Sequence, residues 1–252
     1  MITVLLHLAG PLQTWGATSR WDEHTTLTRP TKSGITGLVA AALGRERADP
    51  LDDLTALVFA VRCDRPGHLT ADFHTAGGGS FGPPPPQHAH RTGLDPDRWY
   101  GAPRHPTLTP AAERGTPPWR PEDRTAVLTR RHYLADAAFL AGLSTPDHHL
   151  AHRIAHALTH PARLLCLGRR SCPPAQPLHH STTRHGPRTW PDRIPLLPSA
   201  TTPTPLVWTE TPPGPGTTAH AEQTPTTHQM RDHPLMHLTS RHTTPPTPGD
   251  TP

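Results

Sequence analysis

Three short segments combine basic side chains with residue types that bind phosphate. Arg29–Gly34 leads into a predicted helix, where basic side chains would join free backbone N–H groups at the positive helix end. Gly168–Pro173 places two adjacent arginines on a loop, and Arg130–Tyr133 lies in a predicted strand that could stack on a base. The candidate phosphate or base contacts in these segments are Arg29, Lys32, Ser33, Arg131, Tyr133, Arg169, Arg170 and Ser171. The structural alternatives are a plain helix start, two solvated arginines and a core tyrosine.

A loop after the first predicted strand carries Gln13 and Trp15, which are candidates for contact with a base or a partner. A loop tryptophan can stack on a base or on a partner, and it can also close the edge of a sheet; for Trp15 we favour the structural role. His74 is a further candidate contact. A metal-independent ribonuclease would use residues such as His74, Tyr133 or Lys32, and spacing does not exclude one.

No metal or cofactor site is expected. The predicted helix over 145–160 carries His148, His152 and His156 on one face, and an H-x-x-x-H pair can chelate zinc. The chain has 21 histidines, however, and no Glu follows the first of these as in H-E-x-x-H, so a solvated face is expected. Its three cysteines form no CxxC pair and are expected to be reduced thiols.

The composition favours a polyanionic partner. Lys32 is the only lysine among 24 basic residues, and arginine offers a planar fork of donors for phosphates. The net charge is +4 and the isoelectric point is near 9.5, which fits a nucleic-acid partner. No apolar run approaches the roughly 18 residues of a membrane span, and the first residues lack a basic leader. We therefore expect a cytoplasmic protein with no membrane partner.

Proline divides the chain into foldable and irregular parts. Residues 1–82 hold 4 prolines and residues 122–172 hold 2, whereas 83–121 hold 11 and 173–252 hold 18. The domain organisation predicted from this is a folded domain over 1–75 and 125–180, an insertion over 76–124, and an irregular Pro/Thr/His-rich region over 181–252.

The folded domain is predicted to be of the α+β class. Its strands are expected at 2–8, 57–63, 68–75, 125–134, 137–143 and 163–167, and its helices at 33–43 and 145–160, with a short one over 50–57. A Pro66-Gly67 turn suggests that the second and third strands form a hairpin. The order β-α-β-β, insertion, β-α-β resembles a ferredoxin-like unit.

Six ordered blocks carry a resemblance to a known family. They are LAGPLQTWG (8–16), RPTKSG (29–34) with GL (37–38), FAVRCD (59–64), DFHT (72–75), YLADAAF (133–139) and LGRRSCP (167–173). In this order they resemble the fifth family of CRISPR-associated proteins, in the RAMP superfamily, which includes the CasD subunit of the type I-E surveillance complex Cascade.

The resemblance implies a non-catalytic, RNA-binding subunit with a ferredoxin-like, RRM-related fold. Such subunits hold the 5′ handle of the guide RNA (crRNA), cap the filament of backbone subunits (CasC) and contact the large subunit (CasA), so that they meet target DNA only indirectly. A thumb-like insertion would map onto 76–124. Handle contacts are expected at the Gln13/Trp15 loop, at Arg29–Ser33 and at Arg169–Ser171.

Two departures from the family pattern concern the insertion and the C-terminus. The insertion is unusually rich in proline, and the last strand, expected after Arg231, is predicted to be replaced by irregular Pro/Thr sequence. Two other functions stay open: a metal-independent endoribonuclease that processes guide-RNA precursor, with His74 or Tyr133 as acid or base, and a scaffold that contacts only proteins.

Overall fold

The structure is a computed structural model that describes residues 1–16, 23–76, 127–215, 217–220 and 236–246. The chain divides into two compact units. The main unit comprises Met1–Ser19, Thr25–Ala71 and His132–Pro252, and the second unit comprises Arg20–His24 and Asp72–Arg131. The predicted thumb-like insertion over 76–124 lies, apart from Ala76, outside the described residues.

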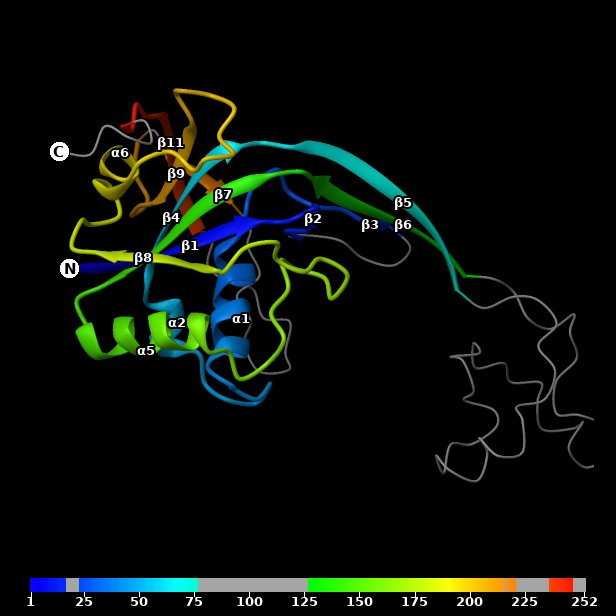
Figure 1. Cartoon of the computed structure of the whole chain (residues 1–252), viewed down its shortest axis with the longest axis horizontal. Helices are drawn as coiled ribbons and strands as arrows, with labels where there is room; N and C mark the ends of the chain where they lie inside the picture. Colours follow the sequence, from blue (N-terminus) through cyan, green and yellow to red (C-terminus); the bar gives the residue numbers. More distant parts are fainter. Residues whose placement is uncertain (17–22, 77–126, 216, 221–235, 247–252) are drawn as a thin grey trace, which may run out of the picture. The chain divides into compact units, whose positions relative to one another are not determined.

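The centre of the main unit is a sheet in the order β10-β11-β9-β4-β7-β1-β8 (Figure 1). Its strands are β1 (Ile2–Ala9), β4 (Val58–Arg65), β7 (Ala138–Thr145), β8 (His179–Thr183), β9 (Leu206–Glu210), β10 (Thr218–His220) and β11 (Met236–His242). All neighbours are antiparallel. β7 lies between β1 and β4, and β1 lies between β7 and β8, so each β-α-β half encloses a strand of the other. The predicted α+β class is confirmed.

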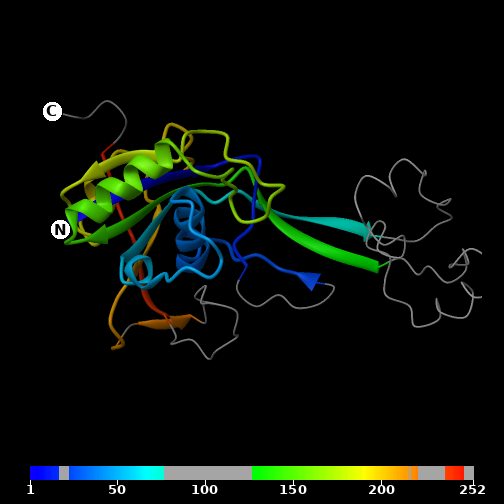
Figure 2. The same cartoon turned by 90° about the horizontal axis from the view of Figure 1, so that it is seen from below.

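Two helices cover one face of this sheet (Figures 1 and 2). They are α1 (Lys32–Ala42) and α5 (His148–Thr159), with the short α2 (Asp52–Thr55) beside them. Each long helix begins at a side-chain cap, because the Thr31 hydroxyl accepts from the backbone N–H of Gly34 and the Asp147 carboxylate accepts from that of Leu150. Alternate residues of β1 pack with the buried residues of these helices in one apolar cluster.

A small sheet has the order β2-β6-β3, and β5 also pairs with β6. Its strands are β2 (Leu12–Gln13), β3 (Glu23–His24), β5 (His68–Ala76) and β6 (Val127–Ala135). β5 was predicted to form a hairpin with β4, and this prediction is wrong. The Gly67 turn is present, with φ +68°, but the strand after it pairs with β6, which follows the insertion in the sequence.

Two predictions about the second half of the chain are wrong. Residues 163–167 form no strand, and β8 instead pairs with β1 at the edge of the sheet. The C-terminal region is not irregular throughout, since β9 pairs with β4 and β11 pairs with β9. Val207 and Thr209 are buried in β9 with half-buried neighbours, which is the alternation of a strand covered on one face. The high proline content of the surrounding region masks this five-residue pattern.

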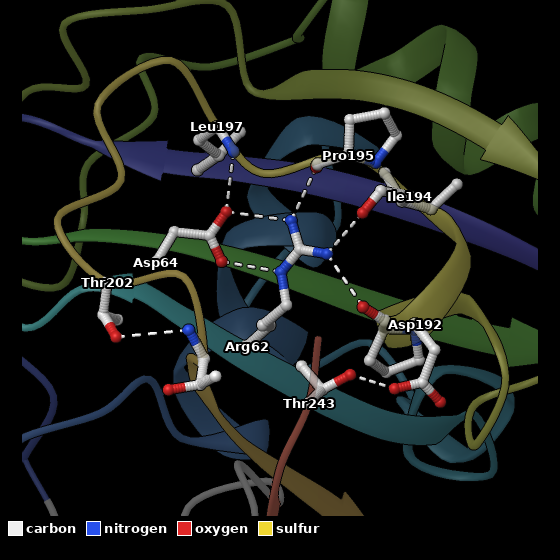
Figure 3. Close-up of polar contacts among 10 residues, drawn as sticks. Arg62, Asp64, Asp192, Ile194, Pro195, Leu197, Thr202 and Thr243 are labelled. Carbon is white, nitrogen blue, oxygen red and sulfur yellow. Dashed lines mark hydrogen bonds and ion pairs between the residues drawn. The ribbon is translucent and has the colours of Figure 1, made fainter. Parts of the chain in front are cut away.

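The second face of the sheet is covered by residues 190–201, which begin with α6 (Trp190–Arg193) and are called the C-terminal strap here. Figure 3 shows how Arg62 of β4 holds it. Its guanidinium forms a bidentate ion pair with Asp64, at 2.6 and 2.8 Å, and donates to the carbonyls of Pro191, Ile194 and Pro195 at 2.6–2.9 Å. The pair is fully buried, so the strap is an integral part of the fold.

Candidate nucleic-acid interface

The segment over residues 10–16, which follows β1 and includes β2, is called the first loop here. Its Gln13 side chain is fully buried. Its amide N–H₂ donates to the carbonyls of Leu8, at 3.1 Å, and Ala137, at 2.8 Å, while its amide oxygen accepts from the Trp15 indole N–H at 3.1 Å. These bonds tie β1, the start of β7 and the loop to one another. We therefore assign Gln13 to holding the loop in place, and not to direct contact with RNA.

Trp15 is buried as well, with 1% of its surface exposed. A Cβ atom added to Gly34 would lie 3.0 Å from the indole ring, so the ring packs directly against the first turn of α1. The backbone N–H of Trp15 donates to the Thr26 hydroxyl at 2.7 Å. Trp15 therefore joins the first loop to the helix start, which agrees with the structural alternative for this residue.

The predicted phosphate site at the start of α1 has its charges directed toward the C-terminal strands. Arg29 is buried, and its guanidinium lies over the ring of Trp208 at 5.9 Å. The Lys32 ammonium donates to both carboxylate oxygens of Glu210 at 2.9 Å. The Ser33 hydroxyl, half-buried, is within 3.3 Å of the Thr31 hydroxyl. In this structure Arg29 and Lys32 connect α1 to β9, which makes them weaker candidates for RNA contact than the sequence suggested.

The segment Gly168–Pro173, called the arginine loop here, sits directly on the first loop. The backbone N–H of Thr14 donates to the carbonyl of Leu167 at 3.0 Å, and its hydroxyl accepts from the backbone N–H of Arg169 at 2.9 Å. Farther along, the N–H of Ala175 donates to the carbonyl of Ala9 at 2.9 Å. Thr14 and Arg169, which are 155 positions apart in the sequence, are thus held side by side.

The side chains of the arginine loop differ in how far they are exposed. Arg169 is half-buried, its guanidinium lies 4.9 Å from the centre of the Tyr133 ring, and its Nη1 donates to the carbonyl of His132 at 3.2 Å. Tyr133 is buried beneath it, with 6% of its surface exposed. Arg170 and Ser171 are exposed. A planar cation on an aromatic ring, next to an exposed arginine, is suited to an unpaired nucleotide with its phosphate.

The two remaining candidates, His74 and Arg131, belong to the second unit. Nδ1 of His74 is 3.8 Å from a carboxylate oxygen of Asp72, and both side chains are about half exposed. Arg131 of β6 is half-buried and stands opposite His24 of β3. These two candidates are therefore described apart from those of the main unit.

Sequence reasoning missed Thr14 and Gly168. Gly168 has φ +96°, and a Cβ atom there would lie 1.9 Å from the carbonyl oxygen of Thr14. Both the backbone angle and the close approach require glycine. The glycine immediately before two arginines was a usable signal of such a turn. The role of Thr14 had no local signal, because its partners come from a distant segment.

Two of the three cysteines are buried, and the three histidines predicted on one helix face are exposed. Cys172 is the buried residue of the arginine loop, and burial raises the pKa of its thiol, although the Ser171 hydroxyl and the Arg169 charge act in the opposite direction. Burial raises the pKa of Cys63 to about 12. His148, His152 and His156 are exposed on α5. Within the described part of the chain, no group of three or more His, Cys, Asp or Glu residues could hold a metal ion.

Comparison with known protein families gives a match over nearly the whole chain. A family model described as CRISPR-associated protein (Cas_Cas5) matches residues 3–243. The chain belongs to the Cas5 family. The resemblance predicted from the six sequence blocks is thereby confirmed. The Cas5 match also runs through β9 and β11, so it includes the C-terminal region for which an irregular, poorly matched sequence was expected.

Individual Cas5-like relatives extend the comparison. The chain is 31% identical over 192 residues to the CRISPR system Cascade subunit CasD of Escherichia coli (strain K12), which covers 71% of this chain and 70% of that protein. It is similar to a chain in the structure of a CRISPR RNA-guided surveillance complex, with a TM-score of 0.68, 31% identity and coverage of 98% of this chain and 95% of that one. It is also similar to a crystal structure of a Cas protein, with a TM-score of 0.60, 28% identity and coverage of 95% of this chain and 93% of that one.

No helix among the described residues is long and apolar enough to cross a membrane.

Proposed function

We propose that this protein is a non-catalytic subunit of a Cascade-type CRISPR surveillance complex, and that its arginine loop binds the 5′ handle of the crRNA. The observation that carries the proposal is the convergence of the first loop, the start of α1 and the arginine loop. Thr14 joins the first loop to the arginine loop, and Trp15 packs on Gly34 at the start of α1.

The chemistry of this site fits single-stranded RNA. Arg170 is exposed and can neutralise a phosphate. Arg169 is held on Tyr133, and its planar guanidinium offers both a charge and a surface on which a base can stack. Gln13 and Trp15 hold the loop from behind, and Arg29, Lys32 and Ser33 order the adjoining helix start. His74 and Arg131 remain candidate contacts on the second unit.

The proposed partners follow the family. Besides the crRNA handle they are the backbone subunit CasC, at the end of the filament, and the large subunit CasA, while target DNA is met only through the assembled complex. The proposed compartment is the cytoplasm. No cofactor or metal enters the proposed role, because binding and capping need none.

The test is RNA binding by the full chain. The probe is an RNA that begins with the repeat-derived handle of the organism's own CRISPR array, and a scrambled handle serves as the reference. The double variant Arg169→Ala/Arg170→Ala should bind the handle at least tenfold more weakly. The slope of log affinity against log salt should become shallower by about 0.7 for each phosphate of the single-stranded RNA that the variant no longer neutralises.

Arg153→Ala is the matched control, because Arg153 is an exposed arginine on α5 and its loss also removes a positive charge. It should leave affinity and slope near wild type. Equal binding of the handle and the scrambled RNA by the wild-type chain would overturn the proposal. Specific cleavage of precursor RNA in EDTA, lost in His74→Ala, would instead support the endoribonuclease.

A further inference from the structure

Thr14 contacts the arginine loop on both sides of Gly168. Its backbone N–H donates to the Leu167 carbonyl at 3.0 Å, and its hydroxyl accepts from the backbone N–H of Arg169 at 2.9 Å. Only 5% of the Thr14 surface is exposed. The residue is therefore not placed to contact a ligand with its own side chain, and its polar groups are directed at the loop.

The backbone between these two bonds lies in direct contact with Thr14. At Gly168, a Cβ atom would be 1.9 Å from the Thr14 carbonyl oxygen and 2.3 Å from its hydroxyl oxygen. No side chain fits between the two segments. The Arg169 backbone is consequently held at hydrogen-bond distance from Thr14 of the first loop.

The Arg169 side chain is held at its other end by β6. Its guanidinium lies 4.9 Å from the Tyr133 ring centre, and Nη1 donates to the His132 carbonyl at 3.2 Å. An arginine side chain has rotamer freedom that is lost when it is fixed. Here that loss occurs on folding, before any ligand arrives, because the backbone and the guanidinium are both anchored.

We infer that Thr14 is a positioning residue for RNA binding: its hydroxyl fixes the arginine loop so that Arg169 is laid on Tyr133 in advance of the handle. The inference rests on the proposed function, because it names the residue through which that site is pre-organised. Preorganisation raises affinity by removing an ordering cost from the binding step.

Two substitutions at Thr14 separate the hydroxyl from the shape of the side chain. Thr14→Val keeps the volume and removes the acceptor, whereas Thr14→Ser keeps the acceptor and removes a methyl group. The loss of one buried hydrogen bond predicts that Thr14→Val weakens handle binding about tenfold, with a shallower salt slope, and that Thr14→Ser stays within about threefold of wild type. Binding is measured well below the melting temperature of each variant, so that all of the chain is folded.

Combining Thr14→Val with the arginine variant decides whether Thr14 acts through the loop. In the Arg169→Ala/Arg170→Ala background, Thr14→Val should have no further effect on affinity, because the groups that it positions are gone. An equal loss in both backgrounds, or wild-type affinity and salt slope for Thr14→Val alone, would overturn the inference. A wild-type chain that does not prefer the handle would overturn the proposed function instead, so the two failures are distinguishable.

Discussion

Removal of the Asp64 carboxylate tests how the C-terminal strap is held. All five N–H groups of Arg62 have partners: two donate to Asp64 and three to carbonyls of Pro191, Ile194 and Pro195. Asp64 also accepts from the backbone N–H of Leu197 at 2.8 Å. In Asp64→Ala, a buried guanidinium loses its counter-charge and a strap amide loses its acceptor.

The expected loss is large because both side chains are fully buried. Removing one partner of such a pair costs about 3–5 kcal/mol. For a chain of this size, each kcal/mol lowers the melting temperature by about 2–4 °C, so Asp64→Ala should melt about 10 °C below wild type. The strap should also detach first, and limited proteolysis should cut within residues 190–201 before it cuts the central strands.

The matched control is Asp53→Ala. Asp53 accepts from both terminal nitrogens of Arg45, which is the same kind of bidentate pair, but the Asp53 side chain is 39% exposed. Exposed pairs contribute at most about 1 kcal/mol. The measurements are thermal melting followed by circular dichroism and urea unfolding of the full chain. If Asp64→Ala lost no more stability than Asp53→Ala, the assignment of the strap to this buried pair would be refuted.

Three further predictions concern other contacts. Burial lowers the pKa of the half-buried His7, so the unfolded chain binds more protons than the folded one. Stability should be full above the unfolded pKa of about 6.5 and should fall as the pH drops below it. Melting temperatures from about pH 7.5 to about pH 5 check this, and His7→Leu should flatten the profile. Gly168→Ala, whose new Cβ would clash with the carbonyl beneath it and whose φ is positive, should weaken handle binding at least fivefold in the same binding assay. Gly142→Ala would place a Cβ atom 2.6 Å from Nε1 of Trp190 and should cost about 1–3 kcal/mol in urea unfolding; an unchanged midpoint would contradict that packing.

Much of the main unit was predictable because its elements carry local signals. The spacing of five apolar residues predicted α1. The structure buries Ile35, Leu38, Val39 and Ala42 and leaves Leu43, the C-cap, half-buried. The apolar run at the N-terminus predicted β1, whereas β9 was not predicted, because its five residues lie within Pro-rich sequence. The pairing of β5 with β6 had no such signal, since strands pair by tertiary contact across an insertion of any length.

The candidate site divides in the same way. Its basic segments were visible in the sequence, because arginines beside glycine and proline identify an exposed turn. Their roles were not visible. Lys32 pairs with Glu210, and Arg29 lies over Trp208, so two predicted phosphate ligands are occupied by a strand from the far end of the chain.

The sequence alone therefore determined the family, the two long helices and the position of the arginine loop, because each depends on residues that are neighbours along the chain. Only the tertiary structure decided which arginines face outward, which are bound inside, and that Thr14 holds the loop. Those outcomes depend on contacts between segments more than 100 residues apart, and such contacts leave no local pattern.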